Sequence, residues 1–386
     1  MSTLGRGAPD YTVNLRGNTY VAEPRTNNEA LRGTSLNQLW LDINSELGRG
    51  PAVEFGAGRF TIDDTLEVEY EQTVVLGQGP QRTEFFLAAG VDDDLWRNNG
   101  NNYYRNVKFQ GMMLNGNKDN NAATSRGIEW IVTDATGGSS QFFASLQLHN
   151  IAIQDCNNYG LIVNFIAGSA GMVMDDFRIA GNGGETVDGA AHQVEINRVS
   201  DSWFGGGGKN TISSILVRGT SSASNHFNNI YIGGGTQYTV VVEGGDANYA
   251  ICGNIFNNCI IDNSYGTAIR LDGYAKRNMF ANCYIQNQTQ THADGTEPAV
   301  LAQGNSSGNI FQGCFFGHTN IATTNRWSYA YEEAESADNN QLIGCVSGYG
   351  AVLGGNAEHF ATDEYNIAGT TVVDGCYKQN GSLWNA

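Results

Sequence analysis

The chain has 386 residues and a formal net charge of −18 at pH 7, because 39 acidic residues stand against 21 basic ones. This charge argues against DNA or RNA as a partner, since phosphate binding needs a basic face. Only five of the basic residues are lysine, and strong acidity with so little lysine predicts adaptation to high salt, where charge repulsion is screened.

The sequence also bears on where the protein works. Its first residues contain no basic-then-apolar signal sequence, and no segment holds the roughly 18 apolar residues that a membrane span needs. We therefore expect a chain that is made in the cytoplasm and does not insert into a membrane. If it acts outside the cell, it leaves inside a virus particle or, alternatively, by a non-classical secretion route.

Residues 1–34 are predicted to form an arm or outer hairpin, and residues 35–48 a helix. Ser35 and Gln38 have the spacing of a capping box, an apolar stripe follows them, and Gly48 ends the helix. Such a helix can cover the first open coil of a repeating structure, whose edge strands and core would otherwise aggregate.

A short phrase recurs in the second half of the chain and predicts its fold. It begins with asparagine and ends with cysteine, and its copies end at Cys259, Cys283, Cys314, Cys345 and Cys376. Their spacing is nearly regular, and a period of about 30 residues without a helical pattern predicts a solenoid. We expect an all-β, right-handed parallel β-helix over residues 49–349, with the short capping helix before it and residues 350–386 closing its far end.

The position before each cysteine is asparagine or glycine, the residues that tolerate the left-handed conformation of a tight bend. Weaker copies upstream bring the predicted bends to nine, at Gly111, Asn150, Asp176, Asn229, Asn258, Asn282, Gly313, Gly344 and Gly375. The cysteines that follow these bends then point inward, as a column of buried thiols or, alternatively, as disulfides between neighbouring coils.

The repeat cannot be followed through the sequence between the predicted bends at Asp176 and Asn229. That gap has room for two coils, but only Ile215 to Arg218 gives a convincing strand. Residues 180–210 are therefore either a long loop or a coil that runs through residues 193–196.

A second strand precedes each phrase by about ten residues and supplies the candidate site. Side chains alternate across a strand, so the pattern predicts an outward column of Glu243, Asp272 and Gln303, continued by Glu332. Neighbouring strands lie about 5 Å apart, and this separation of Glu243 and Asp272 resembles the carboxylate pair of a retaining glycosidase. The alternative is that these two acids meet by chance, because outward columns on any β-helix are polar.

Other residues complete the predicted site. Arg270 shares the outward face of Asp272, Arg218 lies one coil away, and arginines beside acids suit an anionic sugar. Trp327 and Trp203 are candidates for stacking on sugar rings. We expect no metal or cofactor, since the chain has no zinc-type cysteine motif and no phosphate loop, and we interpret Asp92 to Asp94 as a solvated turn.

The opening of the chain resembles a known superfamily. Val53 to Phe60, with its paired glycines, and Val74 to Gly79, followed by Thr83, resemble the first coils of pectate-lyase-like β-helix proteins. The stretch from Asp10 to Ala22 is similar to the hairpin on β-helix proteins of haloarchaea and their tailed viruses. The resemblance implies the fold but not the function, because this fold hosts lyases, hydrolases, epimerases and phage tailspikes.

Three functions are consistent with these observations. The first is a spike- or fibre-type protein of a haloarchaeal tailed virus that binds a cell-surface polysaccharide or glycoprotein glycan, with or without degrading it. The resemblance to tailspikes implies that the protein is a homotrimer in the virion. Residues 1–34 of each chain would then contact other virion proteins. The second is a polysaccharide lyase or glycoside hydrolase of a halophile that uses Glu243 and Asp272. The third is a structural virion protein without affinity for glycan.

Overall fold

The structure is a computed structural model of the chain. It describes residues 9–26, 28–98, 106–121, 125–132, 144–165, 171–180, 182, 194–197, 203–212, 214–219, 223–233, 237–245, 247, 250–262, 266–287, 296–318, 327–334, 336–349, 365–367, 369–378 and 382–384. The chain divides into two compact units, the first comprising Met1–Ile162 with Ile166–Gly183 and the second Val163–Phe165 with Gly184–Ala386.

The first unit begins with a hairpin that is attached to the first coil. Strands β1 (Tyr11–Arg16) and β2 (Thr19–Pro24) pair antiparallel, as the sequence predicts for this segment. Strand β1 also pairs in parallel with β4 (Ala52–Phe55), and β2 pairs with the short strand β3 (Leu31–Gly33). The hairpin therefore extends the sheet of the coils beyond its first strand.

Helix α1 (Leu36–Leu47) confirms the predicted cap. The Ser35 side chain accepts a hydrogen bond from the N–H of Gln38, and Gly48 ends the helix with a φ of 58°. Trp40 is buried: its Nε1 donates to the carbonyl of Glu67 at 2.7 Å, and its ring meets that of Trp96 edge-on at 5.1 Å. The apolar stripe of the helix thus lies on the interior of the first coils.

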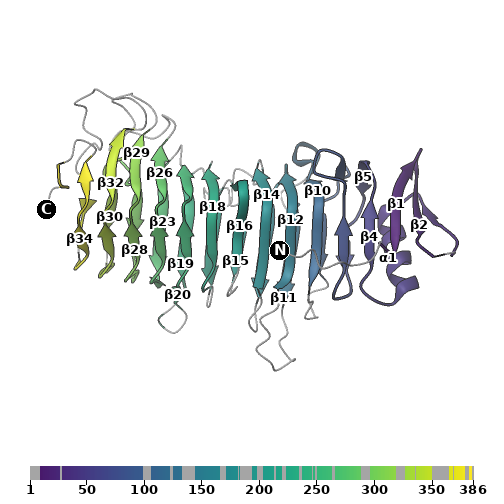
Figure 1. Ribbon diagram of the computed structural model, residues 1–386, viewed down its shortest axis with the longest axis horizontal. Coiled ribbons are helices and arrows are strands. Elements are labelled where there is room, and N and C mark those ends of the chain that lie inside the picture. The colour runs from purple at the N-terminus through teal and green to yellow at the C-terminus, as the bar shows by residue number, and fades with distance from the viewer. Residues whose placement is uncertain are drawn as a thin grey trace. The chain divides into compact units, whose positions relative to one another are not determined.

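The coils of each unit have three sides, and the strands stand side by side in Figure 1. The strands on the two sides that flank the predicted bend belong to one sheet and are called the A strands. The strands on the third side form a second sheet and are called the B strands. The A strands of the first unit are, after β1 to β4, β5 (Gly58–Ile62), β7 (Val74–Leu76), β8 (Thr83–Leu87), β10 (Val107–Asn115), β12 (Ala144–Gln154) and β14 (Gly171–Ala180). Its B strands are β6 (Leu66–Val68), β9 (Trp96–Asn98) and β11 (Ile128–Val132), and β13 (Leu161–Phe165) contributes residues to both units. A short 3₁₀ helix, η1 (Lys118–Asn120), follows β10.

The second unit repeats this plan. Its A strands are β16 (Trp203–Ile212), β18 (His226–Gly233), β21 (Ile255–Asn257), β22 (Ile260–Asp262), β25 (Met279–Ala281), β26 (Tyr284–Asn287), β28 (Ile310–Gln312), β29 (Phe315–His318), β31 (Gln341–Ile343), β32 (Val346–Tyr349), β34 (Val372–Asp374) and β35 (Tyr377–Lys378). Its B strands are β15 (Val194–Asn197), β17 (Ile215–Gly219), β19 (Tyr238–Gly244), β23 (Thr267–Gly273), β27 (Val300–Ala302), β30 (Tyr331–Glu333) and β33 (Tyr365–Asn366). A two-stranded ladder of β20 (Ile251–Cys252) and β24 (Ala275–Lys276) lies between the sides.

All nine predicted bends are confirmed. Each of these residues has a positive φ, from 49° at Asp176 to 71° at Gly111. A residue in this conformation turns the chain sharply, so the apolar residues before and after it both reach the interior.

Three ladders run through the interior of the second unit. The rings of Phe227, Phe256, Phe280 and Phe311 stack at 4.4 to 4.8 Å with nearly parallel planes. The predicted column of thiols is also present, and each thiol donates to a carbonyl of the preceding coil, as Cys283 does to Phe256 at 3.4 Å. All seven cysteines of the chain are free, so the disulfide alternative was wrong.

The third ladder consists of buried asparagines, the first residue of each repeated phrase. The side-chain amide of Asn225 donates to Asn254 at 2.8 Å, Asn254 to Asn278 at 2.8 Å, Asn278 to Asn309 at 2.9 Å and Asn309 to Asn340 at 3.0 Å. Each acceptor oxygen also receives the backbone N–H of the donor residue. Every described coil of this ladder is therefore tied to the next by side chains as well as by its strands.

The structure decides the open alternative for residues 180–210 in favour of a coil. Strand β15 covers Val194–Asn197 and pairs with β17, and β16 pairs with β18. The register of β16 against β18 shifts between Gly205 and Asn210, so residues 206–209 stand opposite the single bend residue Asn229. This insertion explains why the repeat could not be followed through the segment. Among the described residues no helix is long and apolar enough to cross a membrane.

Candidate functional site

The predicted carboxylates lie side by side on the B strands of the second unit. Glu243 on β19 aligns with Asp272 on β23, and Arg218 on β17 aligns with Glu243. The residues before this column on the same strands, such as Val242 and Leu271, are fully buried, so the column faces outward as predicted.

Asp272 is held by three donors. The N–H of Gly273 donates to its Oδ1 at 2.6 Å, the side chain of Gln303 donates to its Oδ2 at 2.7 Å, and Arg270 forms an ion pair with it. Burial alone would raise the pKa of Asp272, but these hydrogen bonds hold it below its ordinary value. Asp272 is therefore an ionised carboxylate whose oxygens are already engaged.

Arg270 connects the site to a neighbouring aromatic ring. Its guanidinium lies 5.1 Å from the centre of the Tyr238 ring, and its side chain is 25% exposed. Burial lowers the pKa of Arg270, but the ion pair with Asp272 outweighs this and raises it, so the group keeps its positive charge. Glu243 on the adjacent strand β19 is exposed, and so is Arg218 on β17, the strand beyond it. The arrangement can bind a ligand with hydroxyl and carboxylate groups, since it offers both a cation and acceptors.

One predicted member of the site, Glu332, is displaced from the column of Asp272. Glu332 on β30 aligns with Leu301, which aligns with Arg270, so it lies two residues away from that column. Its carboxylate instead accepts a hydrogen bond from Asn366 at 3.1 Å. The prediction failed because it placed Glu332 opposite Gln303, whereas the register of β30 puts Glu333 opposite Ala302.

The sequence predicts that Trp327 and Trp203 stack on sugar rings, and the structure tests this prediction for Trp327 only. Trp327 is fully buried, and its Nε1 donates to the carbonyl of Gly266 at 2.9 Å. A buried indole cannot stack on a sugar from solution, so this prediction was wrong. The backbone of Trp203 begins β16, and its side chain lies outside the described residues.

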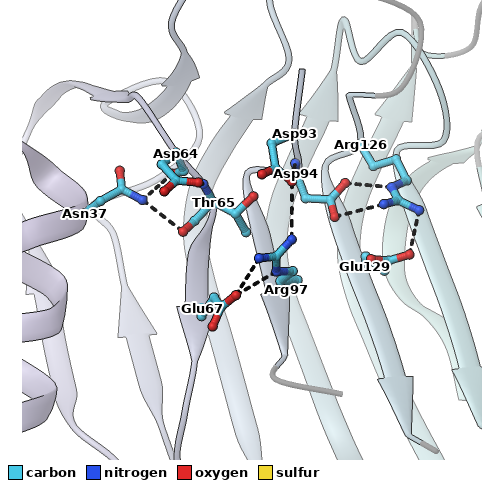
Figure 2. A network of polar contacts seen from close by, with 9 residues as sticks. All are labelled: Asn37, Asp64, Thr65, Glu67, Asp93, Asp94, Arg97, Arg126 and Glu129. Atoms are coloured by element: carbon cyan, nitrogen blue, oxygen red, sulfur yellow. Dashed lines mark hydrogen bonds and ion pairs between the residues drawn. The ribbon is translucent and has the colours of Figure 1, made fainter. Parts of the chain in front are cut away.

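A second polar cluster, which the sequence analysis missed, lies on the first unit (Figure 2). On its B strands Glu67 aligns with Arg97 and Arg97 with Glu129, so charges alternate across three coils. Arg97 binds Glu67 at 2.5 Å, and Arg126 binds Glu129 at 2.5 Å. The sequence does contain a signal for this column: Glu67, Arg97 and Glu129 are spaced along the chain at nearly the same period as the cysteines.

Asp94 is the buried centre of this cluster, so the interpretation of Asp92 to Asp94 as a solvated turn was wrong for this residue. Its side chain is 0% exposed and receives two hydrogen bonds from Arg126, at 2.6 and 3.1 Å. Burial raises its pKa to about 7, even though the Arg126 ion pair lowers it. Asp94 has no contact with solvent, and it therefore ties two coils together rather than acting on a substrate.

The remaining predictions concern metals. Among the residues that the structure describes, no group of three or more histidine, cysteine or acidic side chains is placed to hold a metal ion.

No protein-family model and no curated protein matches this sequence. Solved structures do match. The A-module of the Azotobacter vinelandii mannuronan C-5 epimerase AlgE6 has a TM-score of 0.52 at 13% identity, covering 88% of this chain and 95% of its own. The tailspike protein 2 of bacteriophage CBA120 has a TM-score of 0.54 at 10% identity, covering 85% of this chain and 43% of its own. Gene product 12 of bacteriophage phi29, in its pre-mature form, has a TM-score of 0.55 at 12% identity, covering 89% of this chain and 48% of its own.

These likenesses concern the fold. The chain spans nearly the whole epimerase module but only about half of each phage protein. At such low identity they establish architecture and not chemistry. The chain is thus a right-handed parallel β-helix with a short N-terminal capping helix, the architecture also found in phage tailspikes and in an epimerase module.

Proposed function

We propose that this chain is the β-helix of a viral spike or fibre that binds glycan on the surface of its host. The observation that carries the proposal is the outward cluster of Arg270, Asp272 and Gln303, flanked by the exposed charges of Glu243 and Arg218. Its donors and acceptors suit the hydroxyl and carboxylate groups of a polysaccharide. Its place on a β-helix that is similar in fold to a phage tailspike supports the viral setting.

The acidity of the chain supports a halophilic host, and we propose a tailed virus of haloarchaea. In this proposal the protein is a homotrimer in the virion, and residues 1–34 attach it to other virion proteins. The ligand is a polysaccharide or a glycoprotein glycan, and neither nucleic acid nor membrane insertion is involved.

Binding is favoured over cleavage by the state of Asp272. Hydrolysis by a carboxylate pair needs one group that is protonated and one that is ionised. The low pKa of Asp272 makes it ionised, but both of its oxygens already contact donors within the protein, which suits a group that orients Arg270 and Gln303 for a ligand better than it suits a nucleophile. Degradation by a lyase or hydrolase remains the second candidate function, because Glu243 aligns with Asp272 on an adjacent strand, and the backbones of adjacent strands lie about 5 Å apart.

The experiment compares binding and cleavage in molar salt. Wild type, Glu243→Gln, Asp272→Asn and Arg270→Ala are incubated with surface polysaccharide from halophilic archaea, and mannuronan serves as a defined acidic polysaccharide. Retention on immobilised glycan measures binding, and release of reducing ends or of unsaturated products measures cleavage. Glu332→Gln is the matched control, since this acid lies on the B strands but outside the cluster.

We expect wild type and Glu332→Gln to bind without releasing products, and Arg270→Ala to lose at least tenfold in affinity. Release of products by wild type that is lost in Glu243→Gln and Asp272→Asn would establish the enzyme instead. Absence of both binding and cleavage on every glycan would favour the structural virion protein.

A further inference from the structure

A ridge of uncharged side chains runs along the outside of the second unit. It consists of one outward residue from each of six successive coils, aligned strand by strand. These residues, the apolar ridge, are Tyr231, Ile260, Tyr284, Phe315, Val346 and Tyr377. The strands that carry its middle part, β26, β29 and β32, stand side by side in Figure 1.

The ridge is open to solvent along its length. Ile260 is 40% exposed and Tyr377 is 44% exposed, and the four residues between and beside them are half-buried. Most exposed apolar residues of a soluble protein are scattered singly, whereas an aligned set of six marks an interaction surface.

The rings of the ridge are arranged in a way that disfavours sugar as the ligand. Tyr284 and Phe315 stack on each other at 4.7 Å with planes 5° apart. The ring of Phe315 also lies over Gly317, where a Cβ would meet it at 2.4 Å. Sugars stack on a free aromatic face. Here Tyr284 and Phe315, the two neighbouring rings in the middle of the ridge, cover each other's faces.

The surface beside the ridge carries almost no charge. The next outward position of the same strands is occupied by Gly233, Asp262, Gln286, Gly317 and Gly348. Asp262 is the only acidic or basic side chain among the described outward positions of the four ridge strands β22, β26, β29 and β32, and it is 3% exposed and accepts a hydrogen bond from Tyr231 at 2.7 Å. In a chain with a net charge of −18, this face is an exception.

We infer that the apolar ridge is the surface on which a second copy of this chain packs. Acidic side chains that are brought into contact across an interface repel each other even at 1 M salt, where the Debye length is still about 3 Å, so an uncharged face is where two acidic copies can pack. The centres of protein interfaces are depleted in charge and enriched in tyrosine and phenylalanine, as this ridge is. The inference rests on the homotrimer of the proposed function and names the face that its copies share.

The period of the fold supports a copy of the same chain as the occupant. Coils rise by about 4.8 Å, so the five steps of the ridge span about 24 Å. Another β-helix has the same rise, and its ridge stays in step with this one along that length. A partner without this period would match only a part of it.

The test measures assembly by sedimentation velocity in molar salt over a range of protein concentrations. Ile260→Lys places a charge in the ridge, and we expect it to weaken association at least tenfold relative to wild type. Leu301→Lys is the matched control, since Leu301 is an outward, half-buried residue on the B strand β27. Ile260→Leu keeps the apolar surface and should associate as wild type does, and circular dichroism confirms that each variant is folded.

Each outcome has a distinct meaning. A monomeric wild type at every concentration overturns the inference together with the homotrimer. Assembly that persists in Ile260→Lys, or that Leu301→Lys weakens as much, overturns the choice of face alone. A monomeric Ile260→Lys that still binds immobilised glycan separates the packing face from the glycan site, so failure of one proposal does not imply failure of the other.

Discussion

The side-chain amide of Asn340 donates a hydrogen bond of 3.0 Å to the buried carboxylate of Glu333. Through this bond the asparagine ladder of the second unit ends on an acid. Glu333 is 3% exposed and also accepts hydrogen bonds from Tyr331 at 3.0 Å and from the N–H of Gly369 at 3.1 Å. Thr371 stands one coil after Asn340, where the next asparagine would be, and its hydroxyl contacts Glu333 as well.

The ladder predicts a large effect for a change in its middle. In Asn309→Ala, Asn278 loses its acceptor and Asn340 loses a donor, and both groups are buried. An unsatisfied buried polar group costs about 1–3 kcal/mol, so we expect a loss of roughly 2–5 kcal/mol in the free energy of unfolding. Urea titration followed by circular dichroism measures the change. The control Asn257→Ala removes a half-exposed amide of the same phrase and should cost less than about 1 kcal/mol.

The bends predict a contrast between two substitutions. Asn282→Gly should leave stability nearly unchanged, because glycine occupies the equivalent bend at Gly313 with a φ of 61°. Gly344→Val places a β-branched residue at a φ of 59°, where a Cβ has open space and only the backbone is strained. The left-handed conformation costs an ordinary residue about 1–2 kcal/mol, and valine should reach at least that. Equal melting temperatures for the two variants would contradict the assignment of these bends.

The fold could be predicted from the sequence because its determinants are local and repeated. A bend needs one residue that tolerates positive φ, and the cysteine that follows it marks the period, so nine bends could be placed without any long-range information. The ladder of asparagines carried the same period at Asn254, Asn278, Asn309 and Asn340. Its role was missed because a polar residue appears buried only once the next coil is stacked on it.

The site was harder to predict because the position of a side chain depends on how each coil aligns with the next. Glu332 was assigned to the column of Asp272 by alternation alone, but Tyr331 and Glu333 are the inward residues of β30. An inward glutamate breaks the pattern of apolar and polar residues on which the prediction depended. The burial of Asp94 was equally hidden, since it depends on Arg126, which belongs to the next coil.

Asp94 predicts a dependence of stability on pH. An aspartate of the unfolded chain titrates near 3.8, whereas burial raises the pKa of Asp94 to about 7 in the folded protein. The folded state therefore binds the extra proton between these values, and the stability that this confers is lost as the pH rises from about 4 to about 7. Melting temperatures measured across this range should fall for wild type and fall less for Asp94→Asn.

The pH effect of Asp94 can be separated from that of other acids. Burial raises the pKa values of Asp10 and Asp272, but the ion pairs with Arg49 and Arg270 outweigh it and hold both pKa values below 3.8. Their contribution is present above pH 3.8 and is lost as the pH falls below it. A wild-type profile that is flat from about pH 4 to 7, or one that Asp94→Asn leaves unchanged, would refute the role of Asp94.

The charge of the chain predicts a dependence on salt. A net charge of −18 makes the compact state repel itself, and salt screens this repulsion over a Debye length that falls from about 10 Å at 0.1 M to about 3 Å at 1 M. The melting temperature should therefore rise steeply between low salt and about 1 M potassium chloride and then level off. Sucrose at equal osmolality stabilises without screening, so it serves as the control and should give no such steep rise. A melting temperature that is unchanged between low and molar salt would contradict adaptation to high salt and, with it, the choice of a halophilic host.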